Sequence, residues 1–242
     1  MTEHYIEHII EPEKLLVTWQ GETTGSTEAR HRKIVGELVC HAETITLNYS
    51  TDTKEFHEAQ ESGFDGVPGF PIGTNIFDAT SAFIRRLPPR SRKDFPEYLH
   101  GFRIAEGVEL SDFALMGYTG ARLTDDGITL VHPFDNADPP FEIYTQVQGY
   151  RHYMDDIPLS TIQSGQQVNF VSEPNNEYDP DAVRIDLAES ELEQPTIGYI
   201  SKGLASNFSR WIQNGYQVNG VIERLNGIPE RPLIYVFVTV TA

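Results

Sequence analysis

The second half of the chain is cut into short extended segments by turn residues, and this pattern restricts the folds open to it. Residues 141–242 contain six runs rich in β-branched and aromatic residues, separated by Gly, Pro, Asn, Asp and Ser. The runs are 144–150, 167–171, 182–187, 196–200, 218–225 and 233–240. One helix is expected over residues 202–214, whose apolar side chains fall on one face. Six short strands with one helix predict a small barrel or curled sheet.

The first half of the chain mixes extended and helical segments. We expect strands at residues 14–19, 34–39 and 45–49, where β-branched and aromatic side chains are frequent. We expect helices at residues 53–62, 76–86, 93–99 and 112–118. A polar, proline-rich stretch at residues 135–140 is typical of a linker. The sequence therefore predicts an α+β protein, in which a mixed α/β unit (residues 1–138) precedes a small OB-like β-barrel (residues 139–242).

Charge and the lack of simple targeting signals narrow the classes of partner. The 242 residues include 18 Lys and Arg against 36 Asp and Glu, a formal net charge of −18. Non-specific nucleic-acid binding needs many Lys–phosphate and Arg–phosphate contacts, so any nucleic-acid site here must be small and local. No apolar run approaches the roughly 18–20 residues that span a bilayer. The acidic, polar start also lacks the features of a secretory signal, so we expect no membrane partner and a cytoplasmic location.

Sequence patterns of catalysis are missing. The single cysteine, Cys40, ends an extended run and is expected to be a buried small side chain rather than a catalytic thiol. The acidic pairs at 125–126 and 155–156 are expected in solvated turns rather than around a metal. Neither a Gly-x-Ser-x-Gly elbow nor a Walker phosphate loop occurs. We therefore expect no catalytic residue, no metal and no cofactor, and a binding protein rather than an enzyme.

Three segments of the second half carry side chains suited to binding. Residues 149–153 read Gly-Tyr-Arg-His-Tyr, and residues 173–183 read Glu-Pro-Asn-Asn-Glu-Tyr-Asp-Pro-Asp-Ala-Val. Residues 197–202 read Ile-Gly-Tyr-Ile-Ser-Lys. In this order and spacing the segments resemble the HIRAN domain, over nearly all of residues 141–242. The resemblance implies an OB-like barrel that captures the 3′ end of single-stranded DNA through Arg151, His152, Asn176, Tyr178, Asp179, Tyr199 and Lys202.

The chemistry of these side chains fits such a role. A base stacked on Tyr178 or Tyr199 would contribute about 1–3 kcal/mol without regard to sequence. The Asp179 carboxylate could accept a hydrogen bond from a terminal hydroxyl and would repel a phosphate in the same place. An alternative stays open, because Asn and Asp also cap their own backbone in tight turns. In that case the loop is a turn and the tyrosines are packing residues.

The first half shows a second resemblance. Residues 35–38, 69–71, 83–90 and 120–127 resemble the N-terminal subdomain of HipA-type toxin kinases. The nucleotide and metal motifs of the kinase are absent, so the resemblance implies an interaction module with a protein partner bound through residues 1–138. A rival to DNA binding is accordingly a protein-interaction module, such as an antitoxin-like or phage-encoded regulator whose acidic surface mimics DNA.

A basic cluster lies within this first half, at residues 85–93. In an acidic chain it either binds phosphate or an acidic partner surface, or pairs with nearby carboxylates such as Asp94 and Glu97. The possible partner-binding residues are Arg85, Arg86, Arg90, Arg92 and Lys93.

Overall fold

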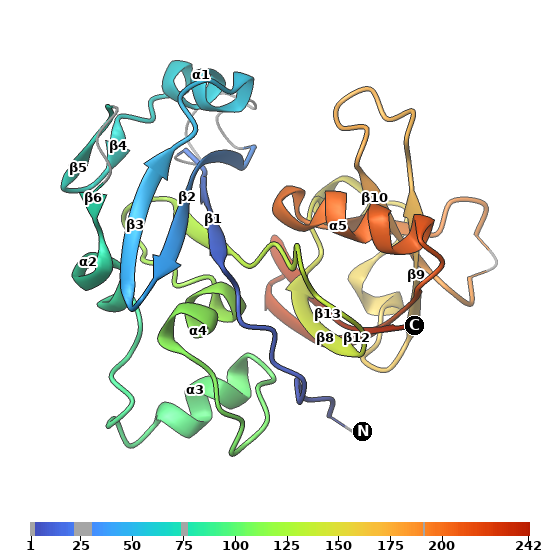
Figure 1. Ribbon diagram of the computed structural model, residues 1–242. Coiled ribbons are helices and arrows are strands. Elements are labelled where there is room, and N and C mark those ends of the chain that lie inside the picture. Colours follow the sequence, from blue (N-terminus) through green and yellow to red (C-terminus); the bar gives the residue numbers. More distant parts are fainter. Residues whose placement is uncertain (1–2, 22–30, 74–76, 191) are drawn as a thin grey trace. The chain divides into compact units, whose positions relative to one another are not determined.

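A computed structural model of the protein describes residues 3–21, 31–73, 77–190 and 192–242. The chain forms two compact units (Figure 1). One unit, here called the barrel unit, consists of Met1–Ile9, Leu99–Val108 and Asp135–Ala242. The other, called the sheet unit, consists of Ile10–Tyr98 and Glu109–Phe134. The division into residues 1–138 and 139–242 stays a prediction. In the structure, the barrel unit also contains two segments of the first half of the chain, Met1–Ile9 and Leu99–Val108.

The sheet unit is built on a five-stranded antiparallel sheet in the order β6-β3-β2-β1-β7. Its strands are β1 (Lys14–Trp19), β2 (Lys33–His41), β3 (Thr44–Tyr49), β6 (Phe77–Asp78) and β7 (Ile128–Val131). Leu15, Val17 and Leu38 are fully buried in its core. A two-stranded ribbon, β4 (Gly66–Val67) with β5 (Phe70–Pro71), accompanies the sheet.

Side-chain caps define the helices of the sheet unit. Helix α1 (Lys54–Glu61) starts where the amide of Phe56 donates a 3.2 Å hydrogen bond to Thr53 Oγ1. Helix α4 (Asp112–Thr119) starts with a 2.9 Å bond from the Ala114 amide to Ser111 Oγ. It ends at Gly120, whose φ of 77° is the left-handed conformation that favours glycine. Helix α3 (Phe95–Gly101) begins in the sheet unit, and its residues from Leu99 onward belong to the barrel unit.

The predicted strands and helices of the sheet unit are confirmed except in one segment. A continuous helix over residues 76–86 is wrong, because the helix there, α2, is only Thr80–Ile84. Residue 76 lies outside the described residues. Phe77–Asp78 forms β6 instead, since the Phe77 ring packs 5.6 Å from that of Phe70 and the Ala79 amide bonds Ile45 O at 2.8 Å. These tertiary contacts outweigh the helical spacing of the apolar residues.

The barrel unit contains a curled, six-stranded antiparallel sheet in the order β11-β10-β9-β12-β13-β8. Beyond the end of β8, Gln148 exchanges backbone hydrogen bonds of 2.8 and 2.9 Å with Tyr199 of β11, so the sheet curls back on itself. All six predicted strands and the predicted OB-like barrel are confirmed. The strands are β8 (Phe141–Gln146), β9 (Gln167–Ser172), β10 (Val183–Leu187), β11 (Thr196–Tyr199), β12 (Gln217–Ile228) and β13 (Arg231–Thr241).

One α-helix and two short 3₁₀ turns complete the barrel unit. Helix α5 (Lys202–Gln213) packs against the sheet, with the Phe208 ring 5.3 Å from Phe170 and the Trp211 ring 5.1 Å from Phe141. The 3₁₀ turns are η2 (Tyr150–His152) and η3 (Leu159–Thr161). Among the described residues, no helix is both long and apolar enough to cross a bilayer.

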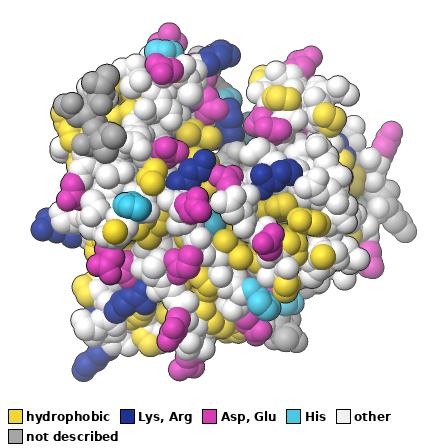
Figure 2. Space-filling model, viewed as in Figure 1, with side chains coloured by type: hydrophobic (Ala, Val, Ile, Leu, Met, Phe, Trp, Pro, Cys, Tyr) yellow, Lys and Arg dark blue, Asp and Glu magenta, His cyan; other side chains and the backbone are white. Residues whose placement is uncertain are grey.

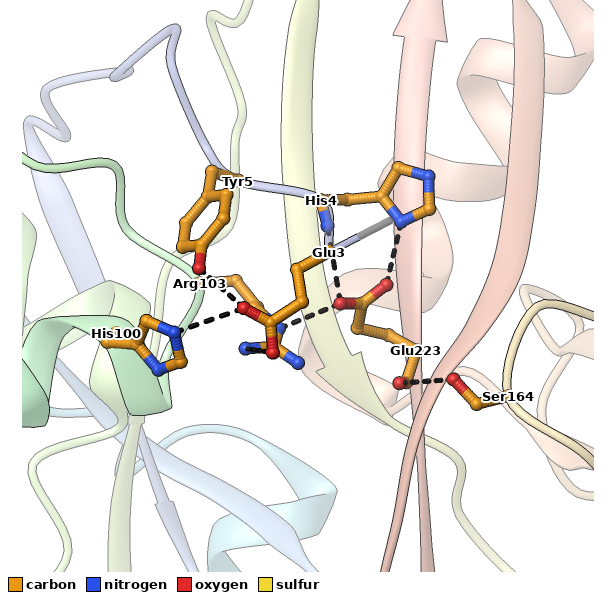
Figure 3. Close-up of polar contacts among 7 residues, drawn as sticks. All are labelled: Glu3, His4, Tyr5, His100, Arg103, Ser164 and Glu223. Carbon is orange, nitrogen blue, oxygen red and sulfur yellow. Dashed lines mark hydrogen bonds and ion pairs between the residues drawn. The ribbon is translucent and has the colours of Figure 1, made fainter. Parts of the chain in front are cut away.

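The start of the chain is held against the barrel by polar contacts (Figure 3). His4 Nδ1 lies 2.7 Å from Glu223 Oε2, and His8 Nδ1 lies 2.8 Å from Glu142 Oε1. Arg103, from the second added segment, places Nε 2.8 Å from Glu223 Oε1. The side chains of Arg103 and Glu223 are only 7% and 4% exposed, so this ion pair is buried. The barrel unit is therefore completed by residues more than 100 positions away from Glu223.

Candidate nucleic-acid interface

The loop between β9 and β10, residues 173–182, is folded by its own polar side chains. Asn176 Oδ1 accepts hydrogen bonds from the amides of Tyr178 at 3.0 Å and Asp179 at 3.2 Å. Asp179 Oδ1 accepts one from the Asp181 amide at 3.0 Å. The Ala182 carbonyl accepts a 2.9 Å bond from the Glu173 amide, which closes the base of the loop. The backbone of this loop is therefore held by hydrogen bonds within the loop itself.

Glu173, at the start of this loop, joins it to two neighbouring strands. Its Oε2 accepts hydrogen bonds from Asn176 Nδ2 at 2.9 Å and from the Tyr199 hydroxyl at 3.1 Å. Its Oε1 accepts one from Arg184 Nη1 at 2.6 Å. Arg184 also forms a two-pronged pair with Asp186. One carboxylate thus ties the predicted loop residue Asn176 to the predicted strand residue Tyr199.

The tyrosines of the region differ in exposure. Tyr178 is 90% exposed, so its ring projects from the fixed loop into solvent. Tyr199 is half-buried, and its ring centre lies 6.4 Å from that of Tyr153. Burial, together with the neighbouring Tyr153 hydroxyl and the Glu173 carboxylate, raises the pKa of Tyr199 above its ordinary value of 10.0. The Tyr199 phenol is therefore neutral at physiological pH and is held in one orientation.

The predicted basic residues lie on the same unit. Arg151 and His152 are exposed on η2, and Arg151 Nε lies 3.2 Å from His152 Nε2. Lys202 is exposed and is the first residue of α5. Ser201, at the N-cap, makes no side-chain capping bond, and no acidic residue stands in the first turn. A cation at the positive end of a helix is locally unfavourable, so this helix end favours an anion.

The position of Asp179 fits both roles considered for it, the turn cap and the acceptor for a ligand hydroxyl. One carboxylate oxygen, Oδ1, caps the turn at the Asp181 amide. The other, Oδ2, has no hydrogen-bond partner within the described residues, and the side chain is half-buried. Asp179 therefore stabilises the loop and still presents an acceptor for a ligand hydroxyl.

Sequence reasoning missed three residues of this arrangement. Glu173 and Arg184 belong to the hydrogen-bond network, and Tyr153 lies beside Tyr199. Glu173 and Tyr153 stand inside the quoted sequence segments, so their position was a usable signal. The sequence gives no such signal for Arg184, because it is one of two polar residues in β10 and only its register against Tyr199 places it here.

The predicted basic cluster of the sheet unit is largely paired with its own carboxylates. Arg86 forms a buried ion pair with Asp126, Arg90 pairs with Asp112, and Arg92 pairs with Asp94. Arg85 and Lys93 are exposed and form no ion pair within the described ranges. Whether the cluster binds a partner stays a prediction.

Acidic side chains are spread over the protein surface. Figure 2 shows Asp and Glu scattered across the viewed face, with Lys and Arg as isolated groups between them. Within the described part of the chain, no three His, Cys, Asp or Glu side chains are grouped to hold a metal ion. On the face shown, the described Lys and Arg residues therefore form no extended basic patch.

A comparison with protein-family models gives one match, which lies within the barrel unit. Residues 140–237 match the HIRAN domain. This HIRAN region includes all the predicted nucleic-acid-binding residues, and the match supports a DNA-binding role for it. No finding supports the resemblance of residues 1–138 to the HipA N-terminal subdomain.

Two solved structures are similar to part of the chain. The crystal structure of the HIRAN domain of human HLTF is 22% identical, with a TM-score of 0.33, and the match covers 41% of this chain and 74% of that one. A protein from Lactobacillus plantarum is 21% identical, with a TM-score of 0.32, over 42% of this chain and 99% of that one. No curated protein matches the chain. The similarity of residues 140–237 to the HIRAN domain therefore rests on the family-model match.

Proposed function

We propose that the HIRAN region captures the 3′ end of single-stranded DNA and acts by binding, without catalysis. The observation that carries this proposal is the self-capped loop of residues 173–182, which holds Tyr178 with 90% of its surface exposed. An aromatic ring on an ordered loop offers a stacking surface without the entropy cost of ordering the loop on binding. Because every base has a π-face, this contact would not depend on sequence.

The other residues of the region supply the remaining contacts of an end-binding site. Tyr199 offers a second ring, oriented by its hydrogen bond to Glu173. Lys202 and the uncapped first turn of α5 would bind a backbone phosphate, with Arg151 and His152 as further donors. These are few cations, so the affinity should depend only weakly on salt. On a single strand each neutralised phosphate contributes a slope of about −0.7 in a log–log plot.

Selection of the 3′ end is assigned to Asp179. A terminal hydroxyl would donate to the unpartnered Oδ2, and a charge-assisted bond of this kind contributes about 1.5–3 kcal/mol. A strand that continues past this point would place a phosphate against the carboxylate, and the two negative charges would repel each other.

The proposal is tested by comparing linear and circular single strands of the same length and composition. Fluorescence anisotropy with the full-length protein should show tight binding of the linear strand and much weaker binding of the circle, which has no end. The measurement should be repeated over a salt series. Equal affinity for the two strands, or a slope that implies six or more phosphates, would overturn end binding in favour of an extended surface.

A further inference from the structure

Three arginines of the sheet unit, Arg32, Arg85 and Arg122, have no carboxylate partner among the described residues, and two of them, Arg32 and Arg122, lie beside strands β1 and β7. Arg32 stands directly before β2, and Arg122 follows the end of α4. Three other arginines of the same unit, Arg86, Arg90 and Arg92, are each paired with an aspartate. In a chain with twice as many acidic as basic residues, arginines without a carboxylate partner within the described ranges stand out.

Neutral side chains hold the Arg32 guanidinium in place. Its Nη1 donates a 3.2 Å hydrogen bond to Thr18 Oγ1, and its Nη2 donates a 3.0 Å bond to Gln20 Oε1. Thr18 is itself 1% exposed and donates to the Thr129 carbonyl at 2.8 Å. A guanidinium has five N–H donors, so three remain after these two bonds. The group is oriented but its charge is not neutralised by these contacts.

Arg122 lies beside the same pair of strands. A Cβ atom added to Gly120 would lie 3.0 Å from Thr129 Cγ2 and 3.8 Å from Arg122 Cγ. The Thr129 side chain and the aliphatic part of the Arg122 side chain therefore both lie next to Gly120. Thr129 is the β7 partner of Thr18 in β1. Burial, and then the charge of Arg122, lower the pKa of Arg32 to about 10. Two neighbouring cations, one of them half-buried, are unfavourable until an anion joins them.

We propose that Arg32 and Arg122 form a binding site for a phosphoryl group on the sheet unit. The planar guanidinium fork matches the oxygens of a phosphate in two-pronged hydrogen bonds, and the phosphate charge balances both cations. The site lies outside the HIRAN region and does not depend on 3′-end binding. Its phosphoryl group could come from a small phosphate or from the backbone of a nucleic acid strand.

Calorimetric titration of the full-length protein with inorganic phosphate, at constant ionic strength set by chloride, tests this site. Wild type should bind phosphate, and Arg122→Gln and Arg32→Gln should each weaken binding by about tenfold or more, the effect of one charge-assisted contact. Arg85→Gln is the matched control, because it removes an exposed, unpaired arginine elsewhere in the same unit. Its phosphate affinity should equal that of wild type.

Arg122 is exposed, so its substitution separates loss of binding from loss of folding, which a melting curve checks for Arg32→Gln. A second titration, with a single-stranded oligonucleotide, identifies the source of the phosphoryl group. Weaker binding of both probes by Arg122→Gln indicates a strand phosphate, and weaker binding of inorganic phosphate alone indicates a small ligand; both support the site. The proposal is overturned if wild type binds no phosphate, or if Arg122→Gln and Arg85→Gln bind it equally well.

Discussion

The Tyr199 hydroxyl donates a 3.1 Å hydrogen bond to the Glu173 carboxylate, and this bond connects the end of β9 to β11. The same carboxylate accepts from Asn176 and Arg184 at 2.9 and 2.6 Å. Glu173 is therefore a positioning residue, since it fixes the loop that carries Tyr178 and the ring of Tyr199 together.

Glu173→Gln should weaken single-strand binding although Glu173 itself need not touch DNA. The amide cannot accept from three donors as the carboxylate does, so the loop and Tyr199 lose their common anchor. We expect a loss of about 1–3 kcal/mol in binding free energy, measured by anisotropy. Glu177→Gln is the control, because Glu177 is an exposed carboxylate of the same loop with no hydrogen bond in the described part of the chain. Equal effects of the two substitutions would show that only net charge matters.

The pKa of Tyr199 gives a second measure of how Glu173 anchors this side chain. Its folded-state pKa is raised above 10.0, so the stability that the neutral phenol contributes is complete below pH 10.0 and is lost as the pH rises through the folded value. The ¹³Cζ resonance of Tyr199 can be assigned with the Tyr199→Phe variant. Its chemical shift should therefore stay at the value of the neutral phenol as the pH is raised to 10.0. In Glu173→Gln it should begin to move at lower pH, because one cause of the raised pKa is removed. An unchanged titration in that variant would contradict the anchoring role.

Tyr178→Ala should reduce binding by about 1–3 kcal/mol without changing the melting temperature. The ring is 90% exposed and adds little to the core, so only the stacking contact is lost. Tyr178→Phe keeps the ring and should bind as wild type does. If the alanine variant binds normally, the exposed ring has no part in recognition.

Arg103→Met should destabilise the barrel unit by about 3–5 kcal/mol, because it leaves Glu223 as a buried charge without its arginine. Hydrogen exchange of the β12 and β13 amides measures this directly. Arg92→Met breaks an exposed pair with Asp94 and should change stability by about 1 kcal/mol or less. Unchanged exchange in Arg103→Met would show that the barrel is independent of residues 99–108.

Some of these structural features can be predicted from the sequence, and others cannot. The strands of the barrel follow from local runs of β-branched residues, and the loop residues Asn176, Tyr178 and Asp179 stand together in the chain. The anchoring by Glu173 depends on strand register, which no local pattern specifies. The pairing of Arg103 and His4 with Glu223 joins residues 120 and 219 positions apart, and short β6 forms only because β3 lies beside it.

Asp179 gives the most direct test of 3′-end recognition. Strands ending in a 3′-hydroxyl or a 3′-phosphate should be competed against each other for wild type and for Asp179→Asn, with a melting curve for each protein. Wild type should prefer the hydroxyl, and Asp179→Asn, which keeps the shape and removes the charge, should lose about 1.5–3 kcal/mol of that preference. A wild type that binds both ends equally, or a variant that only melts earlier and keeps its end preference, would contradict the account.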